Sequence, residues 1–212
     1  MKPTNSMSTI HAYAAKAPKG PLQPFEFEPR KHQNVAKLKE TFEMNKTTTE
    51  IRKVQVERFS LTSSKPFDQV VAALNSAVGH PSMDGFWKAV SEATTKSDME
   101  KVIQSALAPS GFMEFARFDH GGVVHKGETG CHSKVFRFVI GNPLIMRQMA
   151  KHVPDAGSYA PVTVLVDERA DGVHLSYDRM ASFLAAYDNA EALKVARDLD
   201  GKVEALLTSA AG

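Results

Sequence analysis

A chain of 212 residues with 42% hydrophobic and 24% charged residues is large enough to bury a core without metal or disulfide support. The formal net charge of +2 excludes a strong attraction to nucleic acid or anionic lipid, and the single cysteine, Cys131, excludes an intrachain disulfide. No apolar run approaches the roughly 20 residues that cross a bilayer, so we expect a cytoplasmic protein that binds neither nucleic acid nor a membrane.

The first 48 residues differ in composition from the rest of the chain. Five of the eleven prolines lie within the first 30 residues, and proline lacks the amide hydrogen that long helices and central strands need. Residues 1–48 are therefore predicted to form a loosely ordered extension, and residues 49–212 a single domain. Met44 is a candidate alternative start of the protein.

Apolar spacing predicts one strand and three helices before residue 110. These elements are, in chain order, a strand over 50–61 and helices over 67–78, 83–94 and 97–107. Ser63 or Ser64 is expected to cap the first helix, because a serine oxygen accepts a backbone hydrogen there. Ser97 and Glu100 have the spacing of a capping box for the last of the three.

Beyond residue 110 the pattern changes to the alternation that is typical of strands. Strands are predicted over 112–118, 134–141, 162–167 and 172–178, and helices from Pro143, over 180–187 and over 189–208. Asn142 is expected to cap the helix at Pro143, and Gly121-Gly122 to turn the chain into a short strand at Val123-Val124. The prediction is an α+β fold with a mainly antiparallel sheet of about five strands and helices packed on one face.

Histidines gather in the turn-rich segment 119–132. Imidazole and thiolate groups bind zinc, copper or haem iron, so His120, His125 and His132 are candidate metal or haem ligands, with His120 placed at a strand end. The spacing matches no standard zinc motif because Cys131 is alone. The alternative interpretation is a set of surface histidines on hairpin turns.

Two other segments are candidates for binding a small ligand. Gly141 and Asn142 lie where a strand meets a helix start, and the amides of a helix start bind anions; the alternative is a capped helix without a ligand. Tyr159, Tyr177 and Arg179 lie near strand ends and could orient a ligand in an apolar pocket, or form ordinary hydrogen bonds to a loop. We assign no catalytic residue, since no nucleotide-binding or nucleophile motif occurs.

Several short motifs occur together over residues 65–180. They are the helix Phe67–Val78, Gly111-Phe112 at a strand start, Gly141-Asn142-Pro143, Ala160–Val164 and Gly172–Tyr177. This pattern resembles the domain-of-unknown-function 302 family, and the resemblance implies a compact α+β fold with an antiparallel sheet, often dimeric and without a settled function. Residues 79–110 look like an insertion relative to short members. Gly141 stands where short members often have a cysteine, so no thiol chemistry is implied here.

Residues 10–30 resemble the opening of a zinc-dependent medium-chain alcohol dehydrogenase. The chain has neither the zinc motif nor the dinucleotide fingerprint of that enzyme, so dehydrogenase activity is not implied.

Three functions stay open from the sequence. The leading hypothesis is a homodimer that binds a small apolar or anionic ligand without catalysis and without a cofactor. The alternative is a haem- or transition-metal-binding protein, with or without enzymatic activity, that uses His120. The third is an interaction module that recruits its partner through residues 1–48.

Overall fold

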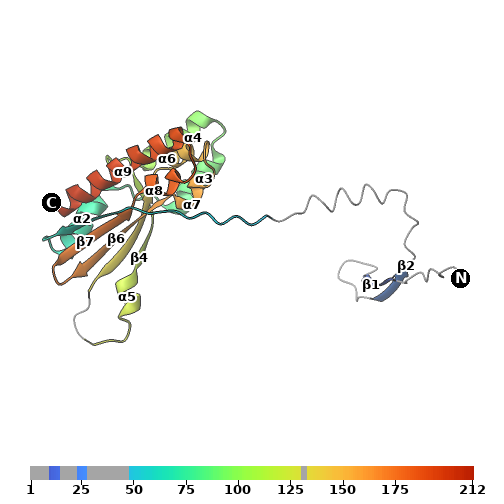
Figure 1. The fold of residues 1–212 in the computed structure, drawn as a ribbon, viewed down its shortest axis with the longest axis horizontal. Coiled ribbons are helices and arrows are strands. Elements are labelled where there is room, and N and C mark those ends of the chain that lie inside the picture. Colours follow the sequence, from blue (N-terminus) through green and yellow to red (C-terminus); the bar gives the residue numbers. More distant parts are fainter. Residues whose placement is uncertain (1–9, 15–22, 28–47, 130–132) are drawn as a thin grey trace. The chain divides into compact units, whose positions relative to one another are not determined.

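The computed structural model describes residues 10–14, 23–27, 48–129 and 133–212. The chain divides into two compact units, Met1–Ile51 and Arg52–Gly212 (Figure 1). In the first unit, β1 (Ile10–Ala14) pairs antiparallel with β2 (Gln23–Phe27), a hairpin that the sequence did not predict. The loosely ordered extension over 1–48 and the single domain over 49–212 stay predictions, and Met44 lies outside the described residues.

The second unit is built on one five-stranded antiparallel sheet in the order β3-β7-β6-β5-β4. Its strands are β3 (Arg58–Ser63), β4 (Met113–Asp119), β5 (Val135–Gly141), β6 (Val162–Arg169) and β7 (Gly172–Asp178). Its described helices are α2 (Phe67–Ala77), α3 (Met83–Glu92), α4 (Lys96–Ala106), α5 (His120–Val124), α6 (Pro143–Ala150), α7 (Ala156–Tyr159), α8 (Met180–Ala185) and α9 (Ala190–Ala211). The predicted α+β class with an antiparallel sheet is confirmed.

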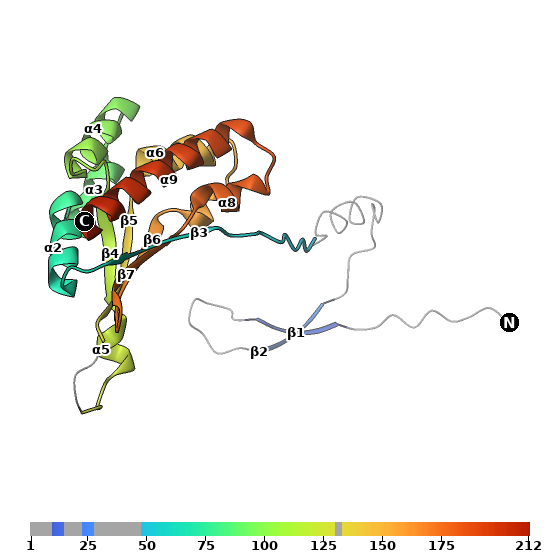
Figure 2. The ribbon, with the colours of Figure 1, turned by 60° about the vertical axis from the view of Figure 1, so that its left-hand side comes forward.

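Helices α2 and α9 lie side by side across one face of the sheet (Figures 1 and 2). Alternate strand residues point into this layer, among them Phe138, Val164 and Leu175, each at most 2% exposed. They meet the apolar stripes of the two helices, represented by Phe67 and Val203. The alternating side chains of the strands and the apolar stripes of the helices therefore form one core. Burial of this core is the main source of the unit's stability.

The opposite face of the sheet, which we call the open face, carries the intervening side chains. Register places Arg137 opposite Leu165, Val139 opposite Thr163, and Leu165 opposite Ser176. These side chains are exposed or half-buried, in contrast to their fully buried neighbours in sequence. The open face thus combines apolar, hydroxyl and cationic groups.

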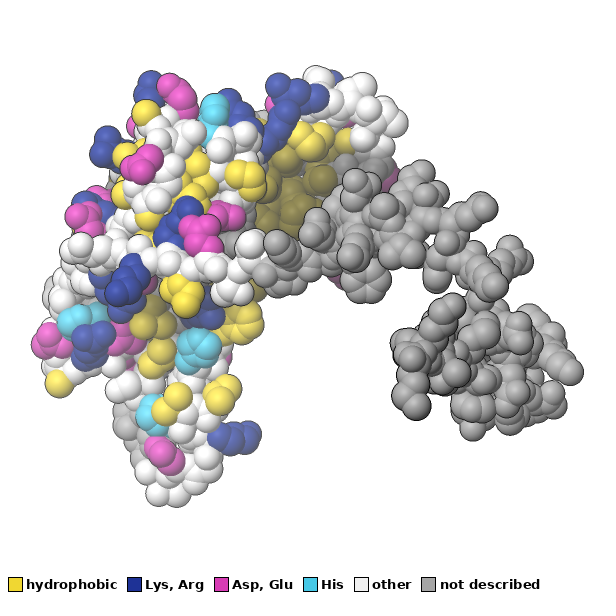
Figure 3. Space-filling view, turned by 45° about the vertical axis from the view of Figure 1, so that its right-hand side comes forward, with side chains coloured by type: hydrophobic (Ala, Val, Ile, Leu, Met, Phe, Trp, Pro, Cys, Tyr) yellow, Lys and Arg dark blue, Asp and Glu magenta, His cyan; other side chains and the backbone are white. Residues whose placement is uncertain are grey.

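Charges of both signs are interspersed over the face of the second unit that Figure 3 shows, with hydrophobic side chains between them. Among the described residues, no helix combines the length and the hydrophobicity needed to cross a bilayer. The expected homodimer and cytoplasmic location stay predictions.

Two predicted local structures are wrong because tertiary pairing decides them. The strand predicted over 50–61 begins only at Arg58, because β7, its partner, ends at Asp178 directly opposite Arg58. The predicted short strand at Val123-Val124 is instead part of α5, whose start is capped by Asp119, an acceptor for the Gly122 amide.

Two predicted helix caps are also wrong. Helix α4 begins after Thr95, which accepts from the Asp98 amide, so the cap lies two residues before Ser97. Helix α2 follows Pro66 without a side-chain cap, while Ser63 donates to the Ala211 carbonyl and so ties β3 to the end of α9.

Asp200 fastens α9 to the corner where β7 passes into α8. Its carboxylate accepts from the Tyr177 hydroxyl at 2.7 Å, the Met180 amide at 2.7 Å and the Ala181 amide at 3.1 Å. Asp200 is only 6% exposed, and this burial raises the pKa of its carboxyl above the ordinary value, while the hydrogen bonds act in the opposite direction. One side chain thereby caps α8 and positions the end of β7.

Replacing Asp200 by alanine should lower the free energy of unfolding by about 2–4 kcal/mol, because it leaves buried donors without their acceptor. Urea denaturation followed by circular dichroism measures the change. The matched control Asp198→Ala, at an exposed position of the same helix, should stay within about 0.5 kcal/mol of the original protein. Equal stability of the two variants would contradict the assigned role.

The raised pKa of Asp200 also predicts a pH dependence. The native carboxyl holds its proton to a higher pH than the unfolded one, so its contribution to stability is complete below pH 3.8 and is lost as pH rises through the native pKa. The free energy of unfolding should therefore fall relative to that of Asp200→Asn as pH rises above 3.8. If the free energy of unfolding instead stayed constant or rose relative to that of Asp200→Asn over this range, burial would not be the dominant effect.

Candidate functional site

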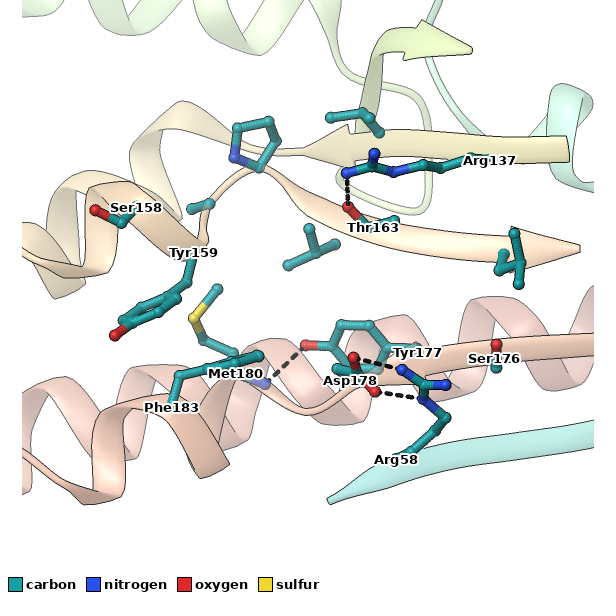
Figure 4. Close-up of a pocket in the computed structure, with 15 residues that line it drawn as sticks. Arg58, Arg137, Ser158, Tyr159, Thr163, Ser176, Tyr177, Asp178, Met180 and Phe183 are labelled. Atoms are coloured by element: carbon teal, nitrogen blue, oxygen red, sulfur yellow. Dashed lines mark hydrogen bonds and ion pairs between the residues drawn. The ribbon is translucent and has the colours of Figure 1, made fainter. Parts of the chain in front are cut away.

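A cavity of about 580 Å³ opens on the open face of the sheet (Figure 4). Four adjacent strands line it, with Arg58 from β3, Ser176 from β7, Thr163 and Leu165 from β6, and Arg137 and Val139 from β5. Strand alternation explains the residues from β5, β6 and β7, because each of them stands between two that point to the helices. The cavity therefore has an apolar centre surrounded by hydroxyl groups and two guanidinium groups.

Aromatic side chains from α7 and α8 form a wall at one end of the cavity (Figure 4). The rings of Tyr159 and Phe183 stack with centroids 4.7 Å apart and an interplanar angle of 14°. The hydroxyl of Tyr159 lies 2.9 Å from that of Tyr187, and this hydrogen bond raises the pKa of Tyr187. The wall is thus fixed by ring stacking and by a hydroxyl pair behind it.

The two arginines of the cavity differ in their partners. Arg58 donates to both carboxylate oxygens of Asp178, at 2.6 and 2.9 Å, so this pair is neutral overall. Arg137 donates to the Thr163 hydroxyl at 3.3 Å, and its guanidinium carbon lies 5.8 Å from the Phe118 ring centroid. No carboxylate among the described residues forms an ion pair with Arg137. Within the described part of the chain, the cavity consequently carries one positive charge that no carboxylate compensates.

Tyr177 lines the same cavity, but its hydroxyl donates to Asp200 and accepts from the Met180 amide. Burial raises the pKa of Tyr177, so the hydroxyl stays protonated at neutral pH. Arg179 does not line the cavity, because its guanidinium donates to Glu204 at 2.7 Å and to Glu57 at 3.2 Å. Of the three predicted ligand residues, Tyr159 and Tyr177 line the cavity, and Arg179 instead links Glu57 to Glu204 of α9.

Asn142 caps α6, with its side-chain oxygen accepting from the Leu144 amide at 2.9 Å and its side-chain nitrogen donating to the Gly111 carbonyl at 3.0 Å. The amides of Ile145 and Met146 donate to the backbone carbonyl of Asn142. Proline at the first helical position has no amide hydrogen. This helix start therefore presents no free amide to an anion.

Gly141 and Asn142 line a second cavity of about 210 Å³, which has mainly apolar walls. The predicted residues Tyr159 and Tyr177 do not reach it, so the structure divides the predicted ligand residues between two cavities.

The histidine cluster is described only in part. The His120 ring stacks on Phe118 at a centroid distance of 6.1 Å, and His125 Nδ1 lies 2.9 Å from a carboxylate oxygen of Glu128. His132 and Cys131 lie outside the described residues. Among the residues that are described, no three histidine, cysteine or acidic side chains converge as metal ligands. Haem or metal binding through His120 stays a prediction.

Sequence reasoning missed the residues that give the larger cavity its charge and shape. A signal for one of them was present, because Arg137 stands between Phe136 and Phe138 in a strand whose phenylalanines face the core. Alternation alone puts that arginine on the opposite face. The missed residues are Arg58, Arg137, Val139, Thr163, Leu165, Ser176, Met180 and Phe183.

Comparisons with known proteins agree with this architecture. A family model described as "Domain of unknown function DUF302" matches residues 87–210, which is more than half of the chain. The crystal structure of an uncharacterized conserved protein DUF302 from Bacillus stearothermophilus superposes with a TM-score of 0.51 at 10% sequence identity. The match covers 72% of this chain and 97% of that one, and it shows a shared fold.

A comparison with curated proteins finds no match. None of these comparisons supports the resemblance of residues 10–30 to alcohol dehydrogenases.

The hydrogen bonds of Asn142 at the start of α6 should contribute measurably to the stability of the domain. Asn142→Ala should lower the free energy of unfolding by about 1–2 kcal/mol, since it removes the acceptor for Leu144 and the donor to Gly111. Asn142→Asp should lose less, because it keeps the acceptor and places a negative charge at the helix start. Urea denaturation of the two variants tests this order, and an alanine variant as stable as the aspartate variant would refute it.

Proposed function

This chain belongs to the DUF302 family, whose function is unknown, and we propose that it binds a small amphipathic anion on the open face of its sheet without catalysing a reaction. The observation that carries the proposal is the guanidinium group of Arg137, which lines the cavity and has no carboxylate partner among the described residues. A guanidinium group binds a carboxylate or a phosphate through two parallel hydrogen bonds.

The surroundings of Arg137 favour a ligand with an apolar body. Val139 and Leu165 lie beside it, and the stacked rings of Tyr159 and Phe183 close one end of the cavity. Hydroxyl groups of the lining can orient the ligand without carrying charge. Cavities that hold small molecules share this composition, in which a mainly apolar lining contains a few convergent polar groups.

The lining also favours binding over chemistry. Its fifteen residues include neither histidine nor cysteine. Asp178 is the acidic residue of the lining, and it is held by Arg58. The Tyr177 hydroxyl is engaged with Asp200. A nucleophile with an adjacent base, the arrangement that covalent and general-base catalysis need, is thus missing from this lining.

Octanoate and octanol, which differ in the charged group, test the proposal. Both should bind, with the Met180 methyl resonance of isotope-labelled protein as the reporter, since Met180 lines the cavity. Arg137→Leu should raise the Kd for octanoate about tenfold or more, because a charge-assisted hydrogen bond is lost, and should change the Kd for octanol less than about threefold.

Two further variants make this test specific. Arg197→Leu removes the same charge from an exposed position of α9 and should leave both affinities unchanged. Leu165→Trp fills the centre of the cavity and should weaken both probes. The proposal fails if octanoate does not bind saturably, or if the leucine variants at positions 137 and 197 bind it equally well.

A further inference from the structure

The second cavity lies where β5 ends, α6 begins and α3 approaches the sheet. It encloses about 210 Å³, and its walls include Trp87, Phe115, Met146, Met149 and Leu199. These side chains come from α3, β4, α6 and α9, so the cavity is formed by tertiary packing and not by a single loop.

The lining offers no group that recognises charge. None of its twelve residues is charged, and both polar atoms of the Asn142 side chain are engaged, the oxygen in capping α6 and the nitrogen in donating to the Gly111 carbonyl. Mainly apolar walls give water few hydrogen-bond partners, and an engineered apolar cavity of about 150 Å³ stays dry and takes up benzene. The chemistry of the walls therefore selects an uncharged apolar molecule.

Trp87 gives this cavity an accessible border. The side chain is 51% exposed although it belongs to an aromatic cluster, with ring centroids 5.0 Å from Phe86 and 6.3 Å from Phe115. Two methionines, Met146 and Met149, lie in the wall, and their unbranched thioether chains adapt to guests of different shape.

Gly141 keeps the cavity open at the sheet end. A Cβ atom at this position would lie 3.1 Å from Cβ of Pro161 and 3.4 Å from Cε2 of Phe115. Any side chain here would therefore enter the space between the β5 end and the aromatic cluster. Glycine fits this close approach without displacing Pro161 or Phe115, whereas a Cβ atom would push them by a few tenths of an ångström.

We infer that this cavity is a second ligand site, for an uncharged aromatic or short aliphatic molecule. It is separate from the open-face site, because the two linings share only Ala160, Pro161 and Val162, and Arg137 belongs to the larger cavity alone. The inference does not depend on anion binding at Arg137.

Methionine methyl resonances distinguish the two sites in one experiment on the full chain. Met146 and Met149 line the apolar cavity, and Met180 lines the open-face cavity. Titration with bromobenzene should shift the Met146 and Met149 methyl resonances saturably and quench the fluorescence of Trp87, the single tryptophan, while the Met180 resonance stays in place. Shifts confined to Met180, or shifts that do not saturate, would overturn the inference.

A pair of variants on α6 provides the control. Met146→Trp should fill the cavity and weaken bromobenzene binding about tenfold or more, a change of about 1.4 kcal/mol. Gln148→Trp adds the same side chain at an exposed position of the same helix and should bind as the original protein does. Equal bromobenzene affinity in the two variants would show that the probe binds elsewhere. As a control, octanoate binding reported by the Met180 resonance should be the same in both variants.

Discussion

Helices α2 and α9 cover one face of the sheet, whereas Arg137, Val139 and Leu165 on the other face stay exposed or half-buried, and the anion-binding proposal depends on that asymmetry. Strand alternation in β5 sends Phe138 and Ile140 into the helix layer and leaves Arg137 and Val139 on the open face. A second layer of helices over the open face would bury the unpaired guanidinium group of Arg137 at a large desolvation cost. With the face open, the same group stays solvated and able to meet an anion.

The corner at Asp200 connects the core to the open-face cavity. Its carboxylate holds the end of β7 and the start of α8 in one hydrogen-bonded cluster. From this start, α8 carries Met180 and Phe183 to the wall of the larger cavity. The turn at Ala160-Pro161 borders both cavities, so packing in one loop shapes two cavities with different linings.

Elements with a strong local signal were predictable from the sequence. The stripe of α9 and the Asn142-Pro143 start of α6 are confirmed, because periodicity and capping are properties of nearby residues. The beginning of β3 and the helix α5 were not, since strand pairing and the Asp119 cap decide them. Within the candidate site, Arg137 was predictable in principle from its place between core phenylalanines. The aromatic wall was not, because it joins helices distant in sequence.

A crystal structure of the complex with a brominated octanoate tests the central claim most directly, because bromine identifies the ligand by its anomalous scattering. The account predicts the carboxylate within hydrogen-bonding distance of Arg137 and the alkyl chain against Leu165 on the open face. Ligand density away from Arg137, or an open face that stays empty while the ligand occupies only the apolar cavity beside Trp87, would contradict it.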